Sequence, residues 1–275
     1  GNSSHPFDVV DLHSINNAMV GKTVQANGYG HHYIENVSPP LVQAGMVIPD
    51  PLSALPMPST TEPCDFSGTR IKAQTVTLDP GVYCGGLRIE SGSNVTLKPG
   101  LYKLRGGNFI VDGSTVSGTD VTVALTDKSV EIEWIDAEVH FDAPRLKTSN
   151  NMYQSIAVVG FRDSNPGTVS NHFIEDSVVN IHGVVYVPNG DFVWVNDGGV
   201  VVDHKWTAWI VDGFSWEGSG ELYFNFQPQL SDIPYPATLV TIPQPGTKVE
   251  FVTHKKWTGE VLVWDGEGGQ PRLVF

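Results

Sequence analysis

The sequence Leu78–Tyr83 (LDPGVY) recurs 19 residues later as Leu97–Tyr102 (LKPGLY). A second unit follows each copy, because Gly85–Val95 (GGLRIESGSNV) recurs after 21 residues as Gly106–Val116 (GGNFIVDGSTV). A two-residue insertion near Lys103-Leu104-Arg105 accounts for the difference between the two offsets. Self-similarity at a short period is the sequence signature of repeat architectures, so we expect stacked units.

Each unit contains three turns that separate three short strands. Pro80-Gly81 is a turn in which proline presets φ and glycine supplies positive φ, and Gly85-Gly86 and Gly92-Ser93 mark two more turns. Leu87 and Ile89 lie on one face of the strand between them, because they are two residues apart. Three strands and three corners in about 20 residues describe one rung of a β-helix, which buries its apolar face by stacking on the next rung.

We therefore predict an all-β fold, a right-handed parallel β-helix (β-solenoid) with proline-rich surface loops. The handedness follows from the general preference of parallel crossover connections. Residues 39–63 contain seven prolines and residues 227–248 contain five, and proline lacks the N–H that a strand ladder needs. We place N-terminal strands and a proline-rich lead-in packed on the solenoid at 1–63, the β-helix body at 64–227, and a second proline-rich loop with capping strands at 228–275.

The composition is that of a folded, acidic protein. Of the 275 residues 40% are hydrophobic and 17% are charged, unlike a disordered chain. The formal net charge of -14 argues against binding to nucleic acid, which requires a Lys/Arg surface, and against an anionic membrane surface. No apolar run approaches the roughly 20 residues that span a bilayer, so we expect any membrane anchor to lie upstream of this sequence.

The two cysteines, Cys64 and Cys84, are predicted to form a disulfide. No CxxC motif occurs, which argues against zinc-ribbon and thioredoxin-like sites. A cysteine pair in a strand-rich, glycine-rich chain indicates an oxidising compartment. In the chain-entropy model, closing a loop of this length stabilises the fold by about 3 kcal/mol. We expect an extracytoplasmic location, in the periplasm or on the cell surface.

Several of these motifs resemble the TadG-like family, whose members are encoded with the bacterial Flp (Tad) pilus. The most specific is Cys64 followed by Pro80–Gly86 (PGVYCGG), and the lead-in Asp50–Pro58 (DPLSALPMP), Leu97–Tyr102 and the strand Val121–Leu125 are also similar. The likeness is clear over residues 45–130 and looser to about residue 230. The resemblance implies an extracytoplasmic β-helix region, typically anchored by an N-terminal membrane helix, that acts in pilus assembly or adhesion.

An enzyme is an alternative, because polysaccharide lyases and hydrolases also use β-helices. Arg70-Ile71-Lys72 copies a tripeptide of polygalacturonases, but the Asn-Thr-Asp, Asp-Asp and Gly-His-Gly motifs of that family are absent from the sequence. Asp136 and Glu138 are suitable Ca²⁺ ligands, yet no DxDxDG loop surrounds them. The sequence also lacks HExxH and GxSxG motifs. We therefore predict no catalytic residue, no cofactor and no metal site.

The aromatic residues of the second half provide the remaining candidates for binding. Trp206, Trp209, Trp216 and Tyr223 are candidate contacts to a partner or a glycan, because flat aromatic faces stack on sugar rings and anchor protein partners. The alternative is that most of these side chains fill the solenoid core.

The predicted function is that of a non-enzymatic cell-envelope protein associated with Flp (Tad) pilus assembly or adhesion. Its expected partners are pilus-assembly or other envelope proteins. The alternatives are a glycan-binding module that binds polysaccharide through the tryptophans and, less favoured, a pectin-lyase-like enzyme.

Overall fold

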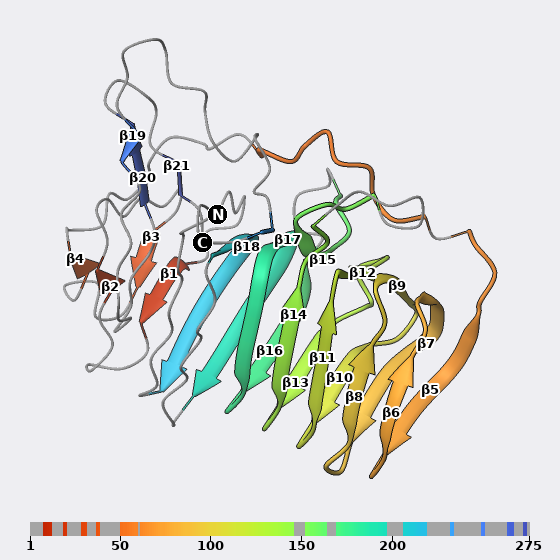
Figure 1. The fold of residues 1–275 in the computed structure, drawn as a ribbon. Helices are drawn as coiled ribbons and strands as arrows, with labels where there is room; N and C mark the ends of the chain where they lie inside the picture. The colour runs from red at the N-terminus through yellow and green to blue at the C-terminus, as the bar shows by residue number, and fades with distance from the viewer. Residues whose placement is uncertain are drawn as a thin grey trace.

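The chain forms an all-β parallel solenoid of about six turns in the computed structural model (Figure 1), which confirms the predicted fold class. The structure describes residues 8–12, 19–20, 29–31, 37–38, 50–59, 61–145, 152–163, 169–196, 206–218, 232–233, 249–250, 263–266 and 272–273. Within these ranges no helix occurs that is long and apolar enough to cross a membrane.

Three faces run along the solenoid, each built from parallel strands in register. The first face contains the starts of β5 (Phe66–Lys72) and β7 (Gly81–Glu90), then β9 (Gly100–Arg105), β12 (Val121–Leu125), β15 (Ile156–Val159), the middle of β17 (Val178–Asn196) and the first half of β18 (Thr207–Gly218). The second face contains the ends of β5, β7, β17 and β18 with β10 (Phe109–Asp112), β13 (Ile132–Ile135) and β16 (Ser170–Glu175). The third face contains β6 (Thr75–Leu78), β8 (Asn94–Leu97), β11 (Thr115–Thr119), β14 (Glu138–Asp142) and the start of β17.

The core consists of ladders of apolar side chains that point inward at the same position of each turn. On the third face, buried valines are paired with one another across the successive strands β8, β11, β14 and β17. They are Val95, Val116, Val139 and Val179. On the second face, Ile89, Val111 and Trp134 form an equivalent ladder. Because each turn covers the apolar side chains of its neighbour, the turns share one continuous core.

The repeated motif builds the corners. The hydroxyl of Tyr83 donates to the carbonyl oxygen of Asp79 at 2.6 Å, and that of Tyr102 lies 2.9 Å from the carbonyl oxygen of Lys98. The motif LxPGxY therefore closes its own turn with a buried tyrosine. At the next corner a Cβ on Gly107 would collide with the backbone of Gly85, so the glycine pair allows the backbones of two turns to stack.

Strand β1 (Asp8–Leu12) lies beside the last turn, and the lead-in from residue 50 returns to the first. Strand β1 pairs in parallel with β18 and with β3 (Tyr29–His31), and β2 (Met19–Val20) pairs with β4 (Val37–Ser38). The lead-in from residue 50 then follows the solenoid back to β5 (Figure 1). Strands β19 (Val249–Glu250), β20 (Val263–Gly266) and β21 (Arg272–Leu273) form an antiparallel sheet of their own.

Contacts fix the lead-in to several turns on its way. Arg162 donates to the carbonyl oxygens of Leu52 at 3.0 Å and Leu55 at 3.1 Å. The hydroxyl of Tyr186 donates to Asp50 Oδ2 at 2.6 Å, and that of Tyr153 donates to the carbonyl oxygen of Pro56 at 2.9 Å. After a turn at residues 51–55, the segment binds the solenoid mainly through carbonyl oxygens and not through a strand ladder, a role that proline can fill. Residues far apart in the sequence are thereby held along one side of the solenoid.

Candidate functional site

The lead-in ends at the predicted disulfide, where several polar contacts join it to the first turns of the solenoid. Cys64 and Cys84 are bonded with an S–S distance of 2.06 Å and a Cα–Cα distance of 5.7 Å. Cys64 lies two residues before β5, the first strand of the solenoid, whereas Cys84 lies within β7. The bond therefore joins the end of the lead-in to the second turn, and the pairing predicted from the sequence is confirmed.

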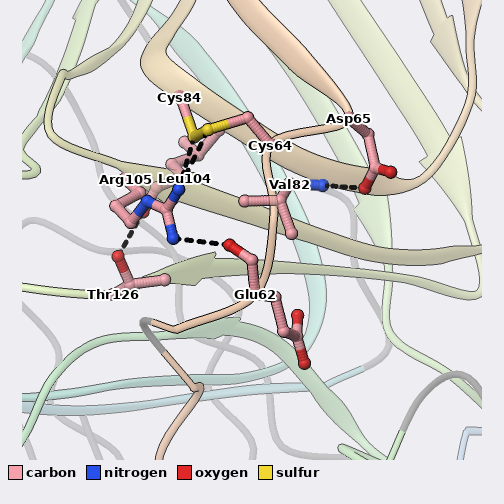
Figure 2. Close-up of a disulfide and its surroundings, with 8 residues drawn as sticks. All are labelled: Glu62, Cys64, Asp65, Val82, Cys84, Leu104, Arg105 and Thr126. Carbon is pink, nitrogen blue, oxygen red and sulfur yellow. Dashed lines mark hydrogen bonds between the residues drawn. A yellow bond between two sulfur atoms is a disulfide. The ribbon is translucent and has the colours of Figure 1, made fainter.

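One guanidinium group contacts both sulfur atoms (Figure 2). Arg105 lies opposite Cys84 in the pairing of β9 with β7, and its Nη2 is 2.9 Å from the Sγ atoms of both Cys84 and Cys64. Its Nη1 donates to the carbonyl oxygen of Glu62 at 2.7 Å. The guanidinium thus bridges the disulfide and the lead-in, with a positive charge held against sulfur.

Two carboxylates on the same stretch complete the attachment. Glu62 forms an ion pair with Lys103 of β9. Asp65 accepts a hydrogen bond from the backbone N–H of Val82 at 2.8 Å (Figure 2). The N–H of Asp65 in turn donates to the carbonyl oxygen of Val82 at 3.0 Å. A Cβ at Gly81 would strike the side chain of Asp65, so the glycine of the Pro-Gly turn also provides space for this contact.

These residues border an open cavity of about 470 Å³. It is lined by Glu62, Asp65, Pro80, Gly81, Val82, Leu101, Lys103 and Met152. Among the described residues, Met152 is the large hydrophobic residue that is exposed, with 49% of its surface accessible to solvent. Nearby, burial and the charges of Asp79 and Asp65 raise the pKa of Tyr83 to about 12, so its hydroxyl stays protonated and remains a donor.

The predicted aromatic contacts do not form a surface in the described part of the chain. Trp206 and Trp209 have exposed fractions of 0% and 3% and lie in the core, and Trp206 Nε1 donates to the carbonyl oxygen of Ile233 at 2.9 Å. Trp209 packs against Trp194 with ring centroids 5.7 Å apart. Neither side chain offers a face to a sugar ring, because Trp206, just before β18, and Trp209, within β18, are both buried in the core. The side chain of Trp216 and the whole of Tyr223 lie outside the described residues.

The sequence features considered for an enzyme or a metal site have structural roles. Arg70 and Arg88 both donate hydrogen bonds to Glu90. These bonds lower the pKa of the Glu90 carboxyl, and the bond from Arg88 has the larger effect. Asp136 occupies a corner with a φ of 48°, and Glu138 begins β14. In the described ranges no three His, Cys, Asp or Glu side chains gather in a way that could hold a metal ion.

Comparisons of this chain with protein-family models, curated proteins and solved structures return no significant match.

Sequence reasoning identified the disulfide but not its surroundings. Arg105 and Lys103 lie at the insertion in the repeat, and Glu62 lies in the proline-rich lead-in, for which the sequence predicts packing on the solenoid but no particular contact. The insertion itself was the available signal. The six residues Gly100–Arg105 precede the second glycine pair, where the four residues Gly81–Cys84 precede the first, and two cations of this longer stretch reach the lead-in.

Proposed function

We propose that this protein is a non-enzymatic structural component of a bacterial cell envelope, with a role in Flp (Tad) pilus assembly or adhesion. The observation that carries the proposal is the disulfide-closed lead-in, in which Cys64 and Cys84 tie a segment of the chain to the solenoid at the residues of the PGVYCGG motif. The motif supports the resemblance to TadG-like proteins, and the disulfide is typical of proteins that function in an oxidising compartment.

The form of the molecule supports a scaffolding role. Its strands are paired across the turns in register, its core is continuous, and the lead-in is fixed at Tyr186, Tyr153 and Arg105 along its length. A rigid solenoid presents long lateral faces at fixed spacing, an arrangement that suits binding to other proteins. On this proposal, the partners are pilus-assembly or other envelope proteins.

In-cell cross-linking followed by mass spectrometry tests the proposal in cells of the source organism. We expect pilin, secretin or other Tad components among the captured proteins, together with loss of surface piliation or attachment when the protein is deleted. Complementation with the intact chain is the control. A deletion strain with unchanged pilus number and unchanged attachment, and capture of peptidoglycan or exopolysaccharide alone, contradict the pilus role.

A further inference from the structure

The contact between Arg105 and the disulfide has a chemical consequence beyond structural support. Its Nη2 is 2.9 Å from each Sγ, and its Nη1 is anchored 2.7 Å from the carbonyl oxygen of Glu62. A guanidinium is a permanent cation with a rigid planar arrangement of donors. A positive charge is thus fixed beside the sulfur atoms in the oxidised protein (Figure 2), in position to neutralise a thiolate that forms there.

Such a cation promotes thiol–disulfide exchange. In this reaction a thiolate attacks one sulfur of the disulfide, and the other sulfur leaves as a thiolate. The leaving step is faster when the departing thiol has a lower pKa, and a neighbouring arginine lowers the pKa of a thiol. Arg105 therefore favours opening of the bond that the fold has formed.

The surroundings distinguish the two sulfur atoms. Cys64 is exposed at the end of the lead-in, whereas Cys84 is only partly exposed within the paired strand β7. Arg105 lies directly opposite Cys84 on β9, and the pairing of the two strands holds them together after the bond opens. Attack at Cys64 with departure of Cys84 is therefore the direction that exposure and the strand pairing favour.

We propose that Cys64–Cys84 is a thiol–disulfide exchange site, at which an external thiolate bonds to Cys64 and Cys84 leaves as a thiolate stabilised by Arg105. The Cys64–Cys84 bond breaks, a bond forms between Cys64 and the incoming sulfur, and the electron pair remains on Cys84. The incoming thiol has lost its proton to solvent beforehand. With a monothiol the product is a mixed disulfide. With a dithiol the second thiolate displaces Cys64, so the dithiol is oxidised and the protein disulfide is reduced.

Opening of the bond changes the attachment of the lead-in. Its covalent tie to the second turn is lost, while the Glu62 contacts to Lys103 and Arg105 remain. The exposed Cys64 then carries the incoming group, which makes it a site of covalent attachment to a thiol-bearing partner. This inference stands independently of the proposed envelope role.

The rate of cleavage by dithiothreitol tests the role of Arg105 in the full chain. Thiol trapping and mass spectrometry follow the reaction for the wild type, Arg105→Gln and Lys103→Gln at one pH. Lys103→Gln is the matched control, since it removes a cation of the same strand that contacts Glu62 and not the sulfur atoms. We expect cleavage of Arg105→Gln to be about threefold slower or more, and Lys103→Gln to match the wild type. An unchanged or faster Arg105→Gln, or an equal slowing in Lys103→Gln, overturns the assignment.

Two further measurements do not depend on how firmly the lead-in is held. The pH dependence of Cys84 alkylation by iodoacetamide is compared between Cys64→Ser and Cys64→Ser/Arg105→Gln. We expect a thiol pKa below the usual value of about 8.5 that rises when Arg105 is replaced, and equal values refute the proposal. Peptide mapping after treatment with glutathione is expected to find the adduct on Cys64, and an adduct on Cys84 refutes the proposed direction.

Discussion

At the scale of single residues, the corner between the second and third faces begins with a left-handed residue in each of five successive turns. These residues are Ala73, Ser91, Gly113, Asp136 and Asp176, with φ values of 51°, 61°, 53°, 48° and 43°. Four of the five are not glycine, so neighbouring turns stabilise a conformation that costs an L-residue roughly 1–2 kcal/mol. At this corner the fold requires a backbone shape and tolerates several side chains.

Glycines of the repeat that face the backbone of a neighbouring turn are predicted to tolerate substitution less well than glycines that face open space. A Cβ on Gly107 meets backbone of the neighbouring turn, whereas one on Gly113 meets nothing within 4 Å. We expect Gly107→Ala to lower the free energy of unfolding by about 3 kcal/mol or more, because two turns must separate. Gly113→Asn is expected to change it by less than about 1 kcal/mol, since Asn tolerates positive φ. Chemical denaturation measures both. Equal losses in the two variants contradict this account of the glycine pair.

A buried histidine predicts how stability depends on pH. His172 Nδ1 accepts the N–H of Ile132 at 3.0 Å, which leaves the ring proton on Nε2, 2.8 Å from Ser170 Oγ. Burial lowers the pKa of His172 from 6.5 to about 3. As the pH falls, the imidazole ring is therefore protonated in the unfolded state while it is still neutral in the folded state. Stability is therefore complete above the unfolded pKa and falls progressively as the pH decreases from 6.5 toward 3.

Replacement of this histidine should remove that part of the pH dependence. Between about pH 7.5 and pH 5, we expect the wild type to lose about 2 kcal/mol more unfolding free energy than His172→Gln. Urea denaturation of both proteins at the two pH values provides the measurement. A wild type and variant with parallel pH profiles would show that the ring is not held neutral by burial.

At the scale of elements, local chemistry made the strands and corners predictable. Pro80-Gly81 and Gly85-Gly86 specify corners through positive φ and through the close approach that glycine allows, and the alternation of Leu87 and Ile89 specifies an inward face. The path of the lead-in was not predictable in detail, because Arg162 and Tyr186 recognise it through contacts across more than a hundred residues. Likewise, no local pattern distinguishes a tryptophan that continues a core ladder from one that faces solvent.

The disulfide is the covalent link between two such elements, and its energetic effect is predicted from the loop that it closes. Cys64 and Cys84 are separated by 20 positions, and closing a loop of this size is worth about 3 kcal/mol in the chain-entropy model. We expect Cys64→Ser/Cys84→Ser to lose about that amount of unfolding free energy while retaining the circular dichroism spectrum of the solenoid. Urea denaturation of the oxidised wild type and the double variant checks this. A double variant as stable as the wild type contradicts the prediction, and loss of the β-sheet spectrum would instead make the bond a condition for folding.

At the scale of the whole molecule, stacking concentrates aromatic residues inside the solenoid. Trp134, Trp194 and Trp206 are among the largest side chains with less than 2% of their surface exposed. Rings of the last turns pack on one another, since Phe192, Trp194 and Phe214 all contact Trp209. The aromatic content of the second half therefore stabilises the end of the solenoid that the N-terminal strand β1 covers by pairing with β18.

Because Trp206 and Trp209 are buried, their replacement is predicted to affect stability and not binding to polysaccharide. We expect Trp206→Ala to lower the free energy of unfolding by about 3–5 kcal/mol, because a large buried side chain is removed and a cavity remains. Trp206→Phe and Trp209→Phe keep an aromatic ring in the core and are expected to remain folded. Affinity electrophoresis with a panel of neutral and acidic polysaccharides then compares both Phe variants with the wild type. Because neither tryptophan is exposed, we expect whatever retention the wild type shows to be unchanged. A Phe variant that keeps the wild-type stability but loses retention would assign glycan binding to these residues and require the last turns to open.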